Sequence, residues 1–305
     1  MQPFRLLSSI PQDLFEPNKD FQAASSIAAS MSYLASADEL FVVAPGNRTV
    51  NSLSPVVTES TLCPVYTTPL SEVPSSVCFI RQTRTLLIAK FSDGNTEGTK
   101  NFSIVALSRD GQNWLQQSEL PLQIAPPDSC EGSTLCELPE STVLFGADRL
   151  KSLFLLKLTP GDQLELLHEV NTPEGYHSVS ATSSKGRTLV TLSLAESNAV
   201  SLSQLAGDQL EELSRLGGLL DGYTHFVLWC GEHLLLAQTT QEGMMEFDQR
   251  VEELDTSNSS IAPSTWLISG RPYVELDAWC CDGERLIVWD RHSHDVMVYN
   301  IASHD

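Results

Sequence analysis

The segment Arg285–Ile301 indicates the fold of this chain. It reads Arg-Leu-Ile-Val-Trp-Asp, then Arg-His-Ser-His-Asp, then Val-Met-Val-Tyr-Asn-Ile. Two runs rich in β-branched and apolar residues on either side of a short polar turn predict a β-hairpin. This hairpin is one copy of a repeat, because five similar hairpins precede it in the chain.

The first strands of these hairpins start at positions 40, 86, 143, 189, 234 and 286, at intervals of 45 to 57 residues. The third strand of the fifth unit is expected at Met244–Phe247. A strand-built repeat of about fifty residues is typical of the blades of a β-propeller.

A short apolar strand precedes each hairpin, as in Val77–Ile80, and another strand follows it after a Gly-Asp turn, as in Gly161–Leu166. Each unit therefore has four antiparallel strands. The sequence predicts an all-β fold in which residues 1–305 form a single six-bladed propeller domain. The last unit has residues for only three strands, so we expect Phe4–Ile10 to add the fourth and close the ring, which would hide an open sheet edge.

Composition limits the range of functions. The chain has 39 acidic and 18 basic residues and a formal net charge of −21, which disfavours binding to nucleic acid or to anionic membrane surfaces. Met1–Asp20 has no apolar core like that of a signal peptide, and no apolar run approaches the ~20 residues of a membrane helix. Seven cysteines without C-x-x-C spacing predict buried, reduced thiols, so a cytoplasmic or nuclear location is expected.

Linear catalytic motifs are absent from the sequence, as are phosphate-binding and dinucleotide-binding motifs. Propeller enzymes place their groups on separate blades, so the rim of the central channel is the place to search. Residues just ahead of the first strand of each four-stranded unit should gather there: Glu131, Tyr176, His177, Tyr223, His225, Tyr273, Glu275 and Asp277.

His177 and His225, with Glu131 or Asp277, are candidate ligands for a divalent metal. The competing interpretation is a polar rim with ordinary hydrogen bonds. It is favoured because these positions do not recur at one offset in the repeat. The expectation is therefore no metal, no cofactor and no catalytic residue.

The turns between second and third strands should lie together on one face of the ring. They carry several basic side chains, and arginine beside aromatic residues is typical of protein contact sites. The residues expected to bind a partner are Arg48, Arg149, Lys151, Tyr223, Arg291 and His292. Polar inserts at Ser92–Lys100, Pro121–Glu131 and Asp255–Pro263 are predicted to be loops, the last of them just before the sixth unit.

The segment Leu286–Asn300 resembles the NHL repeat, in which an apolar strand ends at Asp, a turn with Asn or His follows, and the next strand starts at Val. Trp289-Asp290 is also similar to the Trp-Asp pair of WD40 repeats, whose Gly-His element is missing here. Only the last unit matches well. The other five keep the apolar pattern without the Asp. The resemblance implies a six-bladed propeller from a group dominated by binding platforms, with a minority that hydrolyse or condense small molecules.

The leading hypothesis from sequence is a non-enzymatic scaffold that presents one propeller face to a protein partner. The alternative is a metal-dependent, channel-centred hydrolase of the lactonase or gluconolactonase type. A domain belonging to a longer regulatory protein is a third possibility. The sequence leaves the oligomeric state open.

Overall fold

The structure is a computed structural model, and it describes residues 30–44, 48–54, 63–93, 100–110, 113–122, 124, 132–219, 223–240, 250–255, 261–268, 276–290 and 295–300. Apart from one 3₁₀ turn at Ala35–Ala37, the regular elements of this part are β-strands. They form six antiparallel sheets, of which five have four strands and one has three. In every sheet the strands lie in chain order, so each sheet is a simple meander.

The first half of the ring consists of three four-stranded sheets with these bounds: β1 Met31–Leu34, β2 Glu39–Ala44, β3 Thr49–Ser54 and β4 Cys63–Pro69; β5 Val73–Ile80, β6 Thr85–Asp93, β7 Lys100–Asp110 and β8 Asn113–Leu122; β9 Ser133–Leu138, β10 Thr142–Ala147, β11 Ser152–Thr159 and β12 Gln163–Asn171.

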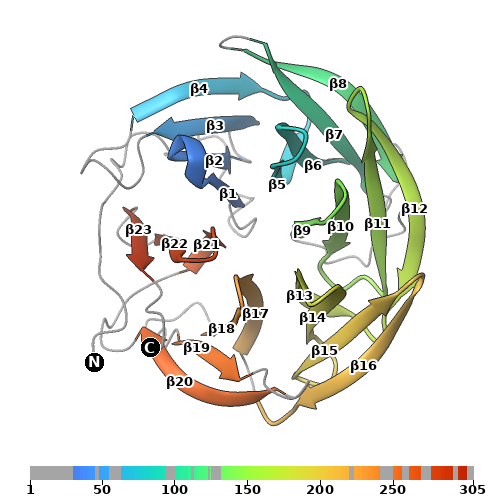
Figure 1. The fold of residues 1–305 in the computed structure, drawn as a ribbon, viewed down its shortest axis with the longest axis vertical. Helices are drawn as coiled ribbons and strands as arrows, with labels where there is room; N and C mark the ends of the chain where they lie inside the picture. The colour runs from blue at the N-terminus through green and yellow to red at the C-terminus, as the bar shows by residue number, and fades with distance from the viewer. Residues whose placement is uncertain are drawn as a thin grey trace.

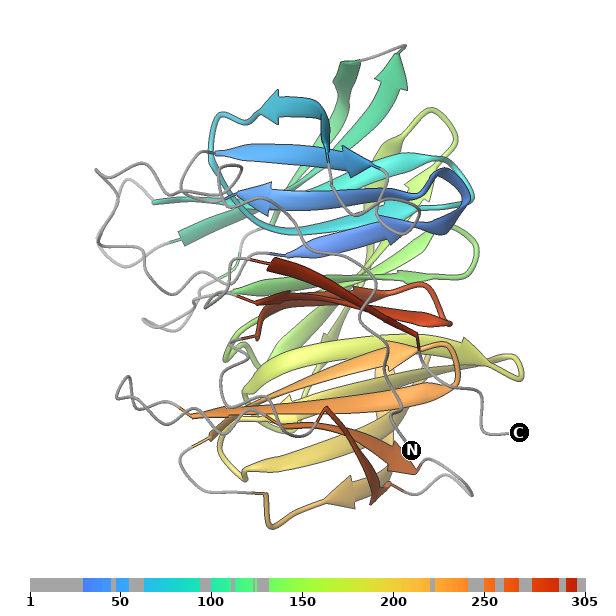
Figure 2. The same ribbon diagram turned by 90° about the vertical axis from the view of Figure 1, so that its left-hand side faces the viewer.

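The second half consists of two four-stranded sheets and the three-stranded sheet: β13 Tyr176–Ser184, β14 Arg187–Leu194, β15 Ala199–Ala206 and β16 Gln209–Leu216; β17 Tyr223–Cys230, β18 His233–Thr240, β19 Arg250–Asp255 and β20 Ala262–Ile268; β21 Leu276–Cys281, β22 Arg285–Asp290 and β23 Asp295–Asn300. Figure 1 shows the sheets around a common axis, with the first strand of each sheet nearest to it. In Figure 2 the sheet β21–β23 lies between the sheets β1–β4 and β17–β20.

The second strand of each sheet contains a central apolar run because neighbouring sheets cover both of its faces. On β6, Leu86 and Ile88 pack toward Phe41 of the first sheet. Leu87 and Ala89, on the opposite face of β6, pack with residues of the third sheet, such as Phe145. All four β6 residues are fully buried. The core of the molecule is therefore a series of apolar layers between blades.

The predicted all-β propeller is confirmed. The prediction of six four-stranded blades is met in five sheets, and the sheet β21–β23 has three strands in the described part of the chain. The closing strand expected at Phe4–Ile10 lies outside the described residues.

The third strand of the fifth sheet was predicted wrongly. It was expected at Met244–Phe247, but β19 runs from Arg250 to Asp255. The insert Asp255–Pro263 consequently separates β19 from β20 and does not precede the sixth unit. The error is understandable because β19 has only two apolar residues, Val251 and Leu254, whereas Met244–Phe247 has three. Pairing with β18 and β20 outweighs this weak local preference.

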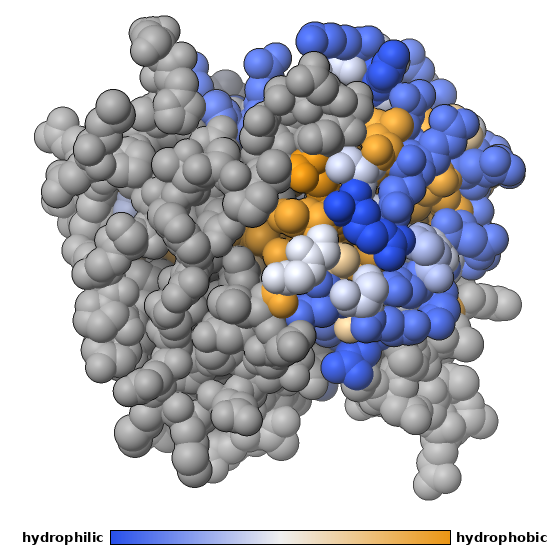
Figure 3. Space-filling view, turned by 90° about the horizontal axis from the view of Figure 1, so that it is seen from below, coloured by the Kyte–Doolittle hydropathy of each residue, from blue (hydrophilic) through white to orange (hydrophobic). Residues whose placement is uncertain are grey.

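The described surface is mainly polar. Seen from below, hydrophilic residues surround smaller apolar areas (Figure 3). Among the described residues, the exposed large apolar side chains are Leu115 on β8 and Leu166 and Leu167 on β12. No helix in the described part of the chain has the length and apolarity to cross a membrane.

Candidate active site

The inner strands of neighbouring blades are joined by serine hydroxyls. An innermost strand is a sheet edge, so its outward N–H groups need partners from outside the sheet. Val77 N donates to Ser30 Oγ at 3.2 Å, and Phe79 N donates to Ser32 Oγ at 3.0 Å.

The arrangement recurs three blades later. Val227 N and Trp229 N each donate at 2.9 Å, to Ser178 Oγ and Ser180 Oγ respectively. Serine pairs with i, i+2 spacing, Ser30 just before β1 with Ser32 on β1, and Ser178 with Ser180 on β13, therefore hold β5 and β17 in register and fix the width of the channel.

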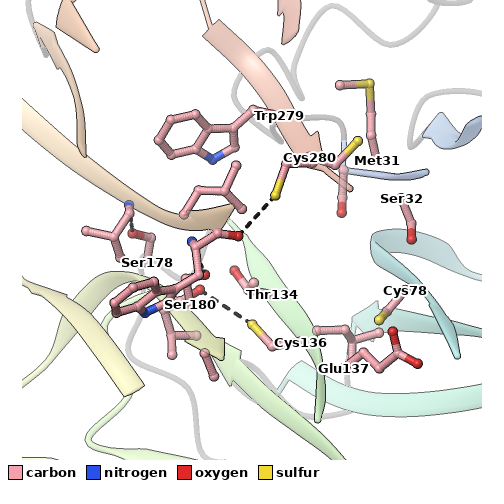
Figure 4. A pocket seen from close by; sticks show the side chains of 18 of the residues that line it. Met31, Ser32, Cys78, Thr134, Cys136, Glu137, Ser178, Ser180, Trp279 and Cys280 are labelled. Carbon is pink, nitrogen blue, oxygen red and sulfur yellow. Dashed lines mark hydrogen bonds between the residues drawn. The ribbon is translucent and has the colours of Figure 1, made fainter. Parts of the chain in front are cut away.

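A cavity of about 400 Å³ follows the axis between the six inner strands. This volume lies within the range of small-molecule sites in proteins. Figure 4 shows how the inner strands send side chains into it, among them Thr134 and Cys136 from β9, Ser180 from β13 and Trp279 from β21. The cavity also reaches His177 and Asp148, at the mouth where the inner strands begin.

His177 lies beside Asp148 at this mouth, with Nδ1 3.2 Å from Oδ1 of the carboxylate. The side chains are 12% and 15% exposed, so both are largely shielded from solvent while still lining the cavity. A carboxylate on Nδ1 fixes the ring orientation and leaves Nε2 as the free nitrogen. The pair thus has the arrangement of a histidine base with its orienting carboxylate.

A β-bulge presents His177. In the pairing of β13 with β14, the register shifts between Tyr176 and Ser178, so His177 is the extra residue. Similar shifts occur at Pro74/Ser76 on β5 and at Leu276/Ala278 on β21. Ser75 and Asp277 are therefore the positional equivalents of His177 on alternate blades. The side chain of Asp277 is outside the described set.

Tyr176 locks the bulge onto the neighbouring blade. Its hydroxyl donates to Ser152 O at 2.9 Å and accepts from Ala147 N at 3.2 Å, while its carbonyl accepts from Arg149 N at 2.6 Å. Because Ala147 and Arg149 flank Asp148, these bonds set the distance between the histidine and the carboxylate. Gly146 makes the approach possible, since a Cβ there would stand 2.7 Å from the Tyr176 hydroxyl oxygen.

Serine hydroxyls continue the polar rim toward the second blade. Ser133 Oγ lies 2.6 Å from Ser75 Oγ and 2.9 Å from Ser76 Oγ. Ser133 also lines the cavity, and β9 pairs it with Ala147, the residue before Asp148. One side of the mouth therefore carries hydroxyl, carboxylate and imidazole groups in succession.

Four of the five described thiols, those of Cys78, Cys136, Cys230 and Cys280, are unsuited to nucleophilic chemistry. All five described free cysteines, Cys78, Cys136, Cys230, Cys280 and Cys281, lie on innermost strands. Burial raises the pKa of Cys136 to about 12 and also raises the pKa of Cys78 and Cys280. The Cys281 thiol, followed by burial, raises the pKa of Cys230. Protonated thiols are poor nucleophiles.

Glu137 stands on β9 toward the other mouth of the channel. Burial raises the pKa of its carboxyl, partly offset by the backbone N–H of Arg81, which donates to it at 2.7 Å. Its second oxygen lies 3.6 Å from Arg81 Nε. Glu137 is thus engaged in a structural contact between two blades.

The residues predicted from sequence have different outcomes. Of the metal candidates, His177 is placed at the mouth, Asp277 occupies the equivalent bulge on β21, the side chain of His225 on β17 is not described, and Glu131 lies outside the described residues. In the described part of the chain, no three His, Cys, Asp or Glu side chains come together as a metal site. Asp148 was not predicted from the sequence as the partner of His177. Asp148 directly follows the second strand β10 and His177 is the second residue of β13, so the repeat indicates that both lie at the same mouth but not that they touch.

The residues expected to bind a partner are only partly described. Arg48 and Arg149 are exposed in their turns, and Lys151 forms an exposed ion pair with Glu196 at 2.9 Å. Tyr223 starts β17, its side chain is not described, and Arg291 and His292 lie outside the described residues. A role for these six residues in partner binding stays a prediction.

No protein-family model matches this sequence, and no curated protein matches it. Solved structures do match. A glucose dehydrogenase aligns with 98% of this chain and 99% of its own at 9% identity and a TM-score of 0.63. The PQQ-bound aldose sugar dehydrogenase of Streptomyces coelicolor aligns over 97% and 96% at 8% identity and 0.61. A putative 6-phosphogluconolactonase of Bacteroides uniformis aligns over 89% and 80% at 15% identity and 0.60.

These matches correct the functional expectation. The leading hypothesis of a non-enzymatic scaffold is wrong as the first choice, because structures with this arrangement of sheets include sugar dehydrogenases and a gluconolactonase-like protein. They favour the alternative of an enzymatic propeller. Identities of 8 to 15% establish the likeness of fold alone.

Proposed function

We propose that this chain is a channel-centred hydrolase that opens a lactone, or cleaves an ester, of a small molecule. The observation that carries the proposal is the His177–Asp148 pair, 3.2 Å apart and bordering a cavity of about 400 Å³. Solved propellers of similar shape that are named as sugar-transforming enzymes support an enzymatic role.

The chemistry follows from the pair. Nε2 of His177 accepts a proton from water as the water oxygen bonds to the carbonyl carbon of the substrate. The Asp148 carboxylate stabilises the imidazolium that forms. When the C–O bond to the leaving oxygen breaks, the imidazolium returns the proton to that oxygen. The products are a carboxylic acid, which releases its proton to water at neutral pH, and a hydroxyl; for a lactone both are parts of one hydroxy acid.

Hydrolysis fits the described lining better than oxidation by a bound quinone. PQQ, present in the aldose sugar dehydrogenase structure, is a tricarboxylate that requires cationic partners. Among the described residues that line the cavity, Arg81 is the one arginine or lysine, and it is engaged with Glu137. A metal-assisted form would use His177 and Asp148 with ligands outside the described side chains, such as Glu131 or His225, and a bound metal would polarise the carbonyl.

We also propose that the ring has six blades of an NHL-like type, with β21–β23 as the sixth blade. The three-stranded sheet and the repeat intervals support this count. A reducing compartment such as cytoplasm or nucleus is proposed as the location, and the five described free thiols support it.

The test uses His177→Gln and Asp148→Asn with a panel of γ- and δ-lactones, followed by acid release in a pH-stat. We expect hydrolysis by the wild type and a loss of about 10²- to 10⁴-fold in kcat for both variants. His168→Gln, at an exposed position on the outer strand β12, is the matched control and keeps full activity.

Wild-type turnover that survives both substitutions would contradict the proposal. Turnover that depends on an added divalent metal and is abolished by chelation would support the metal-assisted form.

A further inference from the structure

The axial cavity has one distinctly apolar wall. Phe226 and Leu228 on β17 and Trp279 on β21 all line the cavity and are only partly buried. They pack on a buried cluster that includes Leu235 and Val288. The apolar wall, defined by Phe226, Leu228 and Trp279, is therefore a rigid surface that exposes part of its area to the cavity.

Polar side chains line the cavity across from Trp279, where β9 contributes Thr134 and Glu137, and beside Phe226, where β13 contributes Ser180. Across from Phe226 and Leu228, β5 contributes Val77, Cys78 and Phe79. Figure 4 shows Trp279 on one side of the pocket, with Thr134 and Glu137 across from it and Ser180 on an adjoining side. A cavity of this kind matches a ligand with an apolar part and a polar part better than it matches a ligand with hydroxyls on all sides.

The apolar wall begins close to His177 and extends inward from it. Val227 N bonds to Ser178 Oγ and Trp229 N to Ser180 Oγ, so Phe226 is level with His177 and Leu228 lies two residues deeper. At about 3.3 Å per residue, the apolar wall extends from the level of His177 to roughly 7 Å deeper. An acyl carbonyl at His177 would place a substituent of several carbons against these side chains.

Resting on the proposed hydrolase function, we infer that the substrate is a lactone bearing an alkyl chain, with the chain inserted against the apolar wall and the lactone carbonyl at His177. Each methylene removed from water there improves binding by about fourfold. A small unsubstituted lactone leaves Phe226, Leu228 and Trp279 in contact with water and gains nothing from them.

The kinetic test compares γ-decalactone, which has a hexyl substituent, with γ-butyrolactone, which has none. We expect the wild type to prefer γ-decalactone by about 100-fold or more in kcat/KM. Leu228→Ser should reduce this preference about tenfold. Leu167→Ser, the same substitution at an exposed position on β12, is the matched control and keeps the preference.

A binding test separates this inference from the hydrolase proposal. The hexyl-substituted γ-lactam and its unsubstituted parent are titrated into the wild-type protein and into Leu228→Ser by calorimetry. Tighter binding of the hexyl compound, weakened by Leu228→Ser, supports the inference even if neither lactone is hydrolysed, which would overturn only the hydrolase proposal. Equal hydrolysis of both lactones, or equal binding of both lactams, overturns the inference and leaves hydrolysis at His177 standing.

Discussion

At the scale of single residues, the candidate site depends on one close approach. Tyr176 can bond to Ala147 N and Ser152 O only because residue 146 has no side chain. Gly146 lies in β10, where glycine is otherwise unfavourable. Its presence is explained by space, since a Cβ would stand 2.8 Å from Val179 Cγ1 as well as 2.7 Å from the Tyr176 hydroxyl.

Gly146→Ala should therefore destabilise the protein and disturb the site together. Overpacking in a buried position costs about 1–3 kcal/mol, and displacement of Tyr176 moves His177 away from Asp148. Urea unfolding gives the stability change, and lactone turnover gives the loss of activity. Gly132→Ala is the control, because a Cβ at Gly132 meets nothing within 4 Å.

Adding Tyr176→Phe to Gly146→Ala removes the hydroxyl oxygen that would stand 2.7 Å from the new Cβ, and it should recover part of the lost stability. A Gly146→Ala variant as stable as the wild type would mean that the contact between β10 and β13 is looser than described here.

At the scale of elements, an ion cluster joins strands of the second blade. Lys90 on β6 is 5% exposed and lies 3.0 Å from Glu119 on β8 and 3.1 Å from Glu72, the residue before β5. Burial alone would lower the pKa of Lys90, but hydrogen bonds and charges from Glu119 and Glu72 outweigh it and raise that pKa. Burial likewise opposes ionisation of Glu119, and the bond to Lys90 outweighs it and lowers the carboxyl pKa.

These shifts give the cluster a pH window. Because the pKa of Glu119 is lowered, its contribution to stability is present above the ordinary value of 4.5 and is lost as the pH falls through the folded value. Because the pKa of Lys90 is raised, its contribution is present below 10.5 and is lost as the pH rises through the folded value. The ion cluster therefore makes its full contribution to stability at neutral pH.

Lys90→Met should lower the free energy of unfolding by about 2 kcal/mol at pH 7, below the range for fully buried pairs because both carboxylates are about a third exposed. The difference from the wild type should shrink as the pH falls below about 4. Denaturant titrations at several pH values measure it. Lys185→Met, in the exposed β13–β14 turn, serves as the control. A difference that stays constant from pH 7 to pH 3 would refute the role assigned to the ion cluster.

The strands also differ in how well the sequence predicts them. The second strand of each of the six sheets was predicted, because the blades that cover both of its faces require an apolar run. β19 was missed because four of its six residues are charged, so it has no such apolar run, and because its place is set by pairing with β18. At the site, His177 was found by its position ahead of a first strand. Asp148 was not recognised as its partner, since a contact between two blades leaves no mark in local periodicity.

At the scale of the whole molecule, the ring depends on how its last sheet is completed. β23 pairs with β22 on one side, and within the described residues no fourth strand covers its other edge. The other five sheets each have an outer fourth strand. An open edge next to buried residues such as Val296 and Val298 would be prone to pairing with other chains. Closure by Phe4–Ile10 is the arrangement we propose.

Deleting residues 1–11 should therefore cause aggregation or a broad, non-cooperative thermal transition, because it leaves the β23 edge unpaired. A synthetic peptide of residues 1–11 added in trans should restore a cooperative transition and raise Tm with peptide concentration, as expected for addition of a strand to a sheet edge. A scrambled peptide of the same composition is the control and should have no effect. If the shortened chain melts like the full one, or if both peptides act equally, Phe4–Ile10 is not the closing strand, and the sixth sheet is completed in another way.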